Sequence, residues 1–299
     1  MRVESAPDAD SGSFLETFKL VLLIKYASWS GVILVKLALD AYEGGTAEVS
    51  ERLASLLTVS FLASIPVMIA LVLWIGSTRV AYGYAVMATI GIDALLKTVR
   101  MGPYFLNHYF LQVIMGVVGL LAVARVASGD RPRDAWRPMA WLAILLWGAA
   151  GAKKFLHGSF ASGDYIASTV AIVRQAPIGW LSDFVLVRDG QALVPERCCV
   201  SGAIDVSAVV AGLVVLAGVG MAVAELLPVG FVLWRGGRAV VGWVMLATTV
   251  VATAVTNEPD FGLTNVALVT LWAETRALRR ACVAFTFAMA GTLIYLMLT

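Results

Sequence analysis

Long apolar segments separated by short charged or polar breaks dominate the chain. A helix that crosses the hydrocarbon core of a bilayer needs about 20 mostly apolar residues. The pattern therefore predicts an all-α, polytopic integral membrane bundle of eight or nine transmembrane helices. The count is eight if one of the two short segments, the third or the eighth, does not cross the membrane. The candidate spans cover residues 18–39, 56–75, 82–96, 107–126, 138–155, 206–226 (or on to 234), 239–255, 262–273 and 281–298.

The connection between the fifth and sixth spans, residues 157–205, is the one loop long enough to build a structure of its own. Its segments 166–173 and 178–187 are apolar enough to lie over the bundle as short interfacial or re-entrant helices. Pro228 is expected to kink or end the sixth span, because proline lacks the backbone donor that a helix interior needs. The sequence shows no internal repeat, so a single transmembrane domain over residues 1–299 is predicted.

Composition narrows the class of protein further. Hydrophobic residues make up 60% of the chain and charged residues 14%, whereas a soluble domain carries about 25% charged residues. A net charge of +2 leaves no polybasic surface for nucleic acid. Three cysteines cannot form a disulfide scaffold, two histidines are too few for a multi-histidine metal enzyme, and no metal is predicted. Continuous apolar segments also exclude an outer-membrane barrel, whose strands alternate.

The lysines and arginines of the short loops predict the orientation. With a cytoplasmic N-terminus, more than half of the basic residues fall on the cytoplasmic side of a bacterial-type plasma membrane, whereas the loop at 40–51 is acidic. Residues 1–17 lack the basic-then-apolar order of a signal peptide, so the first span is expected to remain as an anchor. The cytoplasmic basic residues are Arg2, Lys19, Arg79, Arg125, Arg131, Arg133, Arg137, Arg235, Arg238, Arg276, Arg279 and Arg280.

Several ionisable residues fall inside the candidate spans, where a charge costs a few kcal/mol on insertion scales. Lys36, Lys97 and Glu225 lie near span ends, and we expect their side chains to extend to the interface. Lys25 and Asp93 lie deeper, where an ion pair, a hydrogen-bonded structural role and a functional role are all open.

Lys153 and Lys154 close the fifth span directly after a stretch rich in glycine and alanine that includes Gly148 and Gly151. Small residues let helices approach closely, so this turn is expected within the bundle. A lysine held there loses hydration, which favours a neutral amine able to act as a base. The alternative is that two adjacent lysines only anchor a helix end at the interface.

Several short motifs occur in an order and spacing similar to those of vitamin K-dependent γ-carboxylase. They also resemble the bacterial horizontally transferred transmembrane (HTTM) domain proteins, and the resemblance covers residues 80–275. The motifs are Asn-His-Tyr-Phe-Leu at 107–111, Gly-Ala-Lys-Lys-Phe-Leu at 151–156, Gly-Asp-Tyr-Ile at 163–166, Glu-Leu-Leu-Pro-Val-Gly-Phe-Val-Leu-Trp at 225–234 and Phe-Gly-Leu-Thr-Asn-Val-Ala-Leu at 261–268.

The resemblance implies an enzyme that uses a quinone or hydroquinone of the vitamin K type, either a carboxylase-like lyase or an oxidoreductase. Lys154 matches the base that deprotonates the reduced quinone, with Lys153 beside it, and Asn107 and His108 match the Asn-His motif that orients the quinol. Lys154, His108, Trp147 and Tyr165 are the expected cofactor-binding residues. The predicted topology brings the ends of the fourth and fifth spans together on the extracytoplasmic side.

Two departures set this chain apart from the carboxylase. Nothing after residue 275 can replace the large lumenal domain that holds the protein substrate. No histidine occurs in residues 239–275, so the later helix has lost its imidazole, and Asn257 and Glu258 are the nearest polar groups. Quinol chemistry can persist without glutamate carboxylation.

Cys198 and Cys199 are adjacent in the long outer loop. If the membrane is a plasma membrane, this loop lies in an oxidising compartment. A vicinal disulfide, a redox contact, a soft ligand pair and two unremarkable loop cysteines are all open, whereas Cys282 falls on the cytoplasmic side. These cysteines and the loop support the alternative function, a non-catalytic accessory or maturation subunit that acts on a secreted or membrane protein partner. A transporter is disfavoured because no repeat or pair of broken helices is evident.

Overall fold

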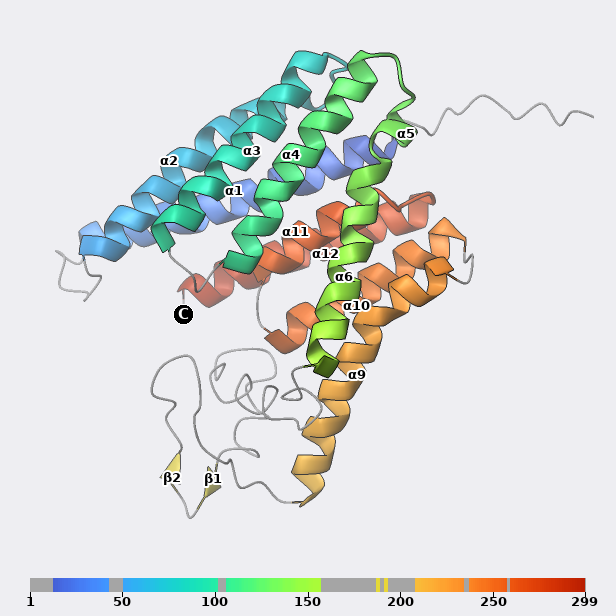
Figure 1. Ribbon diagram of the computed structural model, residues 1–299. Helices are drawn as coiled ribbons and strands as arrows, with labels where there is room; N and C mark the ends of the chain where they lie inside the picture. Colours follow the sequence, from blue (N-terminus) through green and yellow to red (C-terminus); the bar gives the residue numbers. More distant parts are fainter. Residues whose placement is uncertain are drawn as a thin grey trace, which may run out of the picture. The chain divides into compact units, whose positions relative to one another are not determined.

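The computed structural model describes residues 13–42, 51–101, 106–156, 187–188, 191–192, 208–233, 237–256 and 259–298. These residues form helices apart from short connections and one two-residue hairpin, so the predicted all-helical membrane bundle is confirmed (Figure 1). The helices are α1 Ser13–Tyr42, α2 Glu51–Trp74, α3 Val80–Met101, α4 Leu106–Ala127, α5 Pro132–Ala135, α6 Arg137–Leu156, α9 Ala208–Leu233, α10 Arg238–Thr256, α11 Pro259–Thr270 and α12 Arg276–Leu298.

Six of the described helical segments are long and apolar enough to cross a membrane. They lie in α1, α3, α4, α5–α6, α9 and α12, while the apolar segments of α2 and α10 are shorter. At 12 residues, α11 is only about 18 Å long and cannot cross a hydrocarbon core of about 30 Å. The short eighth segment is therefore confirmed, whereas the third was underestimated because α3 continues to Met101.

Two further expectations concern Pro228 in the sixth span and the loop that precedes this span. Pro228 does not end the sixth span, because α9 continues through this proline to Leu233, so the longer of the two expected spans is confirmed, and a kink at Pro228 stays a prediction. The predicted interfacial helices at 166–173 and 178–187 lie outside the described residues, except that Val187 begins the strand β1, Val187–Arg188. This strand pairs antiparallel with β2, Gln191–Ala192, with Val187 opposite Ala192.

The chain divides into two compact units, residues 1–142 with 263–299 and residues 143–262. In the first unit α1 packs against α2 and α12, α2 against α3, and α3 against α4 (Figure 1). Val32 of α1, Leu263 of α11 and Leu293 of α12 form a buried apolar cluster where these three helices meet.

Among the described helices of the first unit, α3 and α4 have the most extensive contact, and glycines make their close approach possible. A Cβ built on Gly116 would lie 2.8 Å from the Cα of Gly91 and 2.9 Å from the carbonyl oxygen of Met87. One turn further along α4, a Cβ on Gly119 would collide with the Met87 side chain. Small residues at these points let the two backbones touch, which is how helices gain packing energy where lipid provides no hydrophobic drive.

The second unit uses the same device between α6 and α9. A Cβ on Gly148 would lie 2.8 Å from Val229, and one on Gly151 would lie 2.8 Å from Leu226. The two contacts follow an antiparallel register of α6 and α9. The small residues that predicted a buried turn at the end of the fifth span therefore do lie against another helix.

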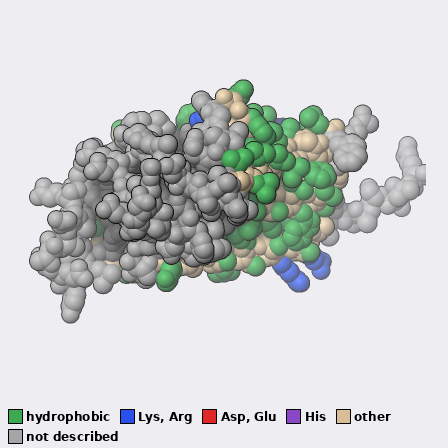
Figure 2. Space-filling view, turned by 90° about the horizontal axis from the view of Figure 1, so that it is seen from below, with side chains coloured by type: hydrophobic (Ala, Val, Ile, Leu, Met, Phe, Trp, Pro, Cys, Tyr) green, Lys and Arg blue, Asp and Glu red, His purple; other side chains and the backbone are tan. Residues whose placement is uncertain are grey.

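The described surface is largely apolar. Figure 2 shows mostly hydrophobic side chains on the described part of one face, with lysine or arginine side chains at its edges. On α4 the exposed positions include Phe110, Val117 and Leu121, and on α12 they include Phe287. Such a surface suits lipid contact, as the integral membrane assignment requires.

Candidate functional site

Lys154 near the end of α6 forms an ion pair with Glu225 of α9. The Lys154 Nζ donates to Glu225 Oε1, and the side chains are 12% and 2% exposed, respectively. The glycine contacts of α6 with α9 bring these residues together although they are 71 positions apart. Extension of Glu225 to the interface was expected and is wrong, because Glu225 is buried and pairs with Lys154 of α6.

Buried polar atoms without a hydrogen-bond partner among the described residues occur at this pair and farther along α6. Among the described residues, neither Glu225 Oε2 nor Trp147 Nε1 has a hydrogen-bond partner. Trp147 and Lys154 are seven residues apart and share one face of α6, two turns from each other. The Trp147 ring packs edge-to-face on Phe261, with ring centroids 6.4 Å apart. An unused carboxylate oxygen and an unused indole donor are what a ligand with both a hydroxyl and an oxygen acceptor can bind.

The structure separates the two adjacent lysines. Lys153 is exposed and has no hydrogen bond or ion pair among the described residues, whereas Lys154 is half-buried and paired. A helix turns about 100° per residue, so only one of two neighbours can face α9. The position that resembles the carboxylase base is the one that contacts the carboxylate.

Where the other predicted site residues lie relative to this pair is outside what the described residues show. Asn107 and His108 lie in the first turn of α4, in the first unit, and their side chains lie outside the described residues. Tyr165, Cys198 and Cys199 also lie outside them, as do Asn257 and Glu258. Their roles stay predictions.

A second buried polar cluster lies between α1, α3 and α4 of the first unit. Lys97 Nζ donates to Asp93 Oδ2 at 2.8 Å, one turn apart on α3, and both side chains are buried. The ammonium of Lys97 also lies 5.8 Å from the ring centroids of Tyr26 and Tyr109. The expectation that Lys97 extends to the interface is therefore wrong, while the ion-pair alternative for Asp93 is confirmed.

Sequence reasoning identified Lys25 as a deep ionisable residue but missed two other members of this region, Tyr26 and Gln112. Lys25 is buried with its ammonium 5.0 Å from the Tyr26 ring centroid, and the Tyr26 hydroxyl donates to Gln112 Oε1 at 3.4 Å. Within the described residues, Asp93 Oδ1 and Gln112 Nε2 have no hydrogen-bond partner. A glutamine inside the apolar segment 107–126 was a signal that could have identified Gln112.

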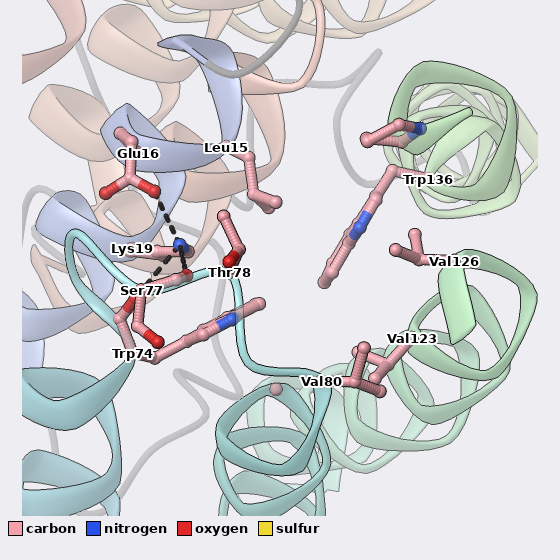
Figure 3. Close-up of a pocket in the computed structure, with 12 residues that line it drawn as sticks. Leu15, Glu16, Lys19, Trp74, Ser77, Thr78, Val80, Val123, Val126 and Trp136 are labelled. Carbon is pink, nitrogen blue, oxygen red and sulfur yellow. Dashed lines mark hydrogen bonds and ion pairs between the residues drawn. The ribbon is translucent and has the colours of Figure 1, made fainter. Parts of the chain in front are cut away.

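A third feature is a cavity of about 170 Å³ where α1 begins and α2 ends (Figure 3). At its edge Lys19, 2% exposed, donates to Glu16 at 2.5 Å and to the carbonyl oxygens of Trp74 and Ser77 at 3.0 and 3.3 Å. An ammonium at the C-terminal carbonyls of α2 interacts favourably with the helix dipole. Trp136 lies across the cavity from these groups (Figure 3).

The lining of this cavity also shows which helix ends lie together. It joins the start of α1, the connection from α2 to α3, the end of α4 and α5. Arg133 after α4 bonds Glu274 before α12 at 2.9 Å, which adds that connection to the same end of the first unit. The alternating order of the predicted spans is consistent with this grouping, and the cytoplasmic location of this end stays a prediction.

No protein-family profile, curated protein or solved structure matches the chain.

Proposed function

We propose that the protein binds a reduced quinone at the Lys154–Glu225 pair and that this pair accepts a proton from a quinol hydroxyl. The observation that carries the proposal is a largely buried ion pair, in an apolar helix bundle, whose carboxylate has one oxygen without a hydrogen-bond partner among the described residues. Burying a charged pair inside a membrane bundle costs desolvation free energy, and ionisable residues in such positions are therefore candidates for a functional role. The HTTM-like and γ-carboxylase-like motifs, which make Lys154 the expected base, support the same site.

Each residue has a distinct task in this proposal. The Glu225 Oε2 atom accepts the proton and gains an O–H bond, while the Lys154 ammonium stays beside it and balances the negative charge left on the donor oxygen. The two groups titrate as a pair, so the pair as a whole gains one proton. Trp147 Nε1 donates to an oxygen of the bound ring. A reduced quinone supplies the acidic hydroxyl and reaches a site between helices from the lipid.

The proposal is tested by measuring the quinone that co-purifies with detergent-extracted protein, using mass spectrometry and added menaquinol as the probe. The double variant Lys154→Gln/Glu225→Gln removes both charges together, so neither is left buried alone. Its quinone retention should fall at least about tenfold because charge-assisted hydrogen bonds are lost. Trp147→Phe keeps the ring but removes one neutral donor, and it should reduce retention about fivefold.

Lys153→Gln is the matched control, since it removes the same charge from the exposed neighbour. It should retain quinone like the wild type, and the thermal unfolding of all variants should be compared. Equal retention in the wild type and the double variant would reject the site, and so would the absence of quinone from every sample after menaquinol addition.

A further inference from the structure

A separate cavity of about 570 Å³ opens at the corner where α4 passes through α5 into α6. Three arginines and two aspartates supply its charged groups, and Trp141 and Pro138 complete the lining. Arg125 Nε donates to Asp130 Oδ2 at 2.7 Å. Arg131 and Arg137 are exposed and form no hydrogen bond or ion pair within the described part of the chain, so their guanidinium groups are available to a ligand.

The chemistry of these groups favours a phosphate. Guanidinium groups bind phosphate oxygens through paired, charge-assisted hydrogen bonds. The cavity carries an excess of one positive charge, because Asp130 is already neutralised by Arg125 and only one further aspartate, Asp134, lines it together with Arg131 and Arg137. Asp134 can accept a hydrogen bond from a hydroxyl of the same ligand.

The apolar surface next to the cavity indicates that this ligand is a lipid. Phe110, Val117 and Leu121 are exposed on α4, and Arg125 follows one turn after Leu121. Spacings of seven and four residues place these side chains on one face of the helix. An outward apolar stripe that ends at an arginine is the surface that an acyl chain and its head group cover together. A soluble phosphate would use only the arginines.

We propose that this cavity binds the head group of an anionic phospholipid, with Arg131 and Arg137 on the phosphate and an acyl chain along the α4 stripe. Basic residues at the cytoplasmic end of a helix bundle, where the positive loops are predicted, attract anionic lipids. Trp141, one turn into α6, belongs to the residue type that prefers the head-group level. The inference does not depend on the quinone proposal, since it uses other residues.

The test measures the binding of phosphatidylglycerol to the purified protein by native mass spectrometry, with phosphatidylcholine, phosphatidylethanolamine and inorganic phosphate as comparison probes. The variant Arg131→Gln/Arg137→Gln should bind phosphatidylglycerol about 20-fold more weakly than the wild type, given the contribution of each basic residue near a membrane surface. Both side chains are exposed, so the fold should persist, and thermal unfolding checks this.

The control variant Arg276→Gln/Arg280→Gln removes two exposed charges from the first turns of α12, outside the cavity lining. It should bind phosphatidylglycerol within about twofold of the wild type, because charges that do not line the cavity act on the head group only through screened fields. If both double variants lose phosphatidylglycerol binding equally, the net charge of the protein explains the binding, and the proposed site is overturned. Equal binding of phosphatidylcholine or phosphatidylethanolamine would overturn the requirement for an anionic lipid. Equally strong binding of inorganic phosphate would reject the lipid.

Discussion

Replacing Gly116 by alanine is expected to lower the free energy of unfolding by about 3 kcal/mol or more, at the upper end of overpacking effects. The added methyl group would lie 2.8 and 2.9 Å from the Cα and amide nitrogen of Gly91 and 2.9 Å from the carbonyl oxygen of Met87. These are backbone atoms, which cannot rotate away, so α3 and α4 must separate along their contact. Thermal unfolding in detergent and the yield of monodisperse protein measure the effect.

The control is Gly91→Ala, on the other side of the same contact. A Cβ at Gly91 meets only the Cα of Gly116, at 3.8 Å, which is an ordinary van der Waals distance. This variant should stay within about 1 kcal/mol of the wild type, because alanine is also the better helix former. Comparable destabilisation by the two variants would mean that the α3–α4 contact does not have the geometry described.

Replacing Asp93 by asparagine is expected to destabilise the protein by about 3–5 kcal/mol, since it leaves the buried Lys97 ammonium without its carboxylate. The double variant Asp93→Leu/Lys97→Met fills similar space without charges and should be close to the wild type or more stable. The free energy of unfolding of the wild type, Asp93→Asn and the double variant can be compared in the same detergent, with heat or an added anionic detergent as the denaturant.

The double variant also separates structure from function at this cluster. If it folds and retains the activity of the wild type, the Asp93–Lys97 pair only maintains the packing of α3 against α1 and α4. If it folds but loses an activity that the wild type has, the buried pair takes part in that activity. A stable Asp93→Asn protein would contradict the burial of Lys97, which is 5% exposed.

The two lysine–carboxylate pairs illustrate what a sequence pattern can and cannot find. Asp93 and Lys97 are four residues apart on one helix, a spacing that places them side by side in any α-helix. Lys154 and Glu225 are 71 residues apart, and their pairing depends on how α6 and α9 pack. The first pair could have been recognised from spacing alone, and the second could not.

The sequence by itself determined the elements of this protein. Apolar length alone locates nine of the helices to within about five residues, because the thickness of the hydrocarbon core dictates the length of a span, whereas the short α5, Pro132–Ala135, was not predicted. It also located the small residues of α6 that permit a close helix contact, and the short segment that became α11.

Only the tertiary structure decided which face of each helix is buried. In a soluble protein the polar face of a helix reveals its orientation, but lipid is as apolar as the interior of a membrane bundle, so the pattern leaves that rotation open. The packing therefore decided that Glu225 meets Lys154, that Lys97 is buried with Asp93, and that Lys19 binds the carbonyl end of α2. Helix rotation and register, which hydropathy does not encode, decide the burial of Lys97 and the partners that Glu225 and Lys19 meet on other helices.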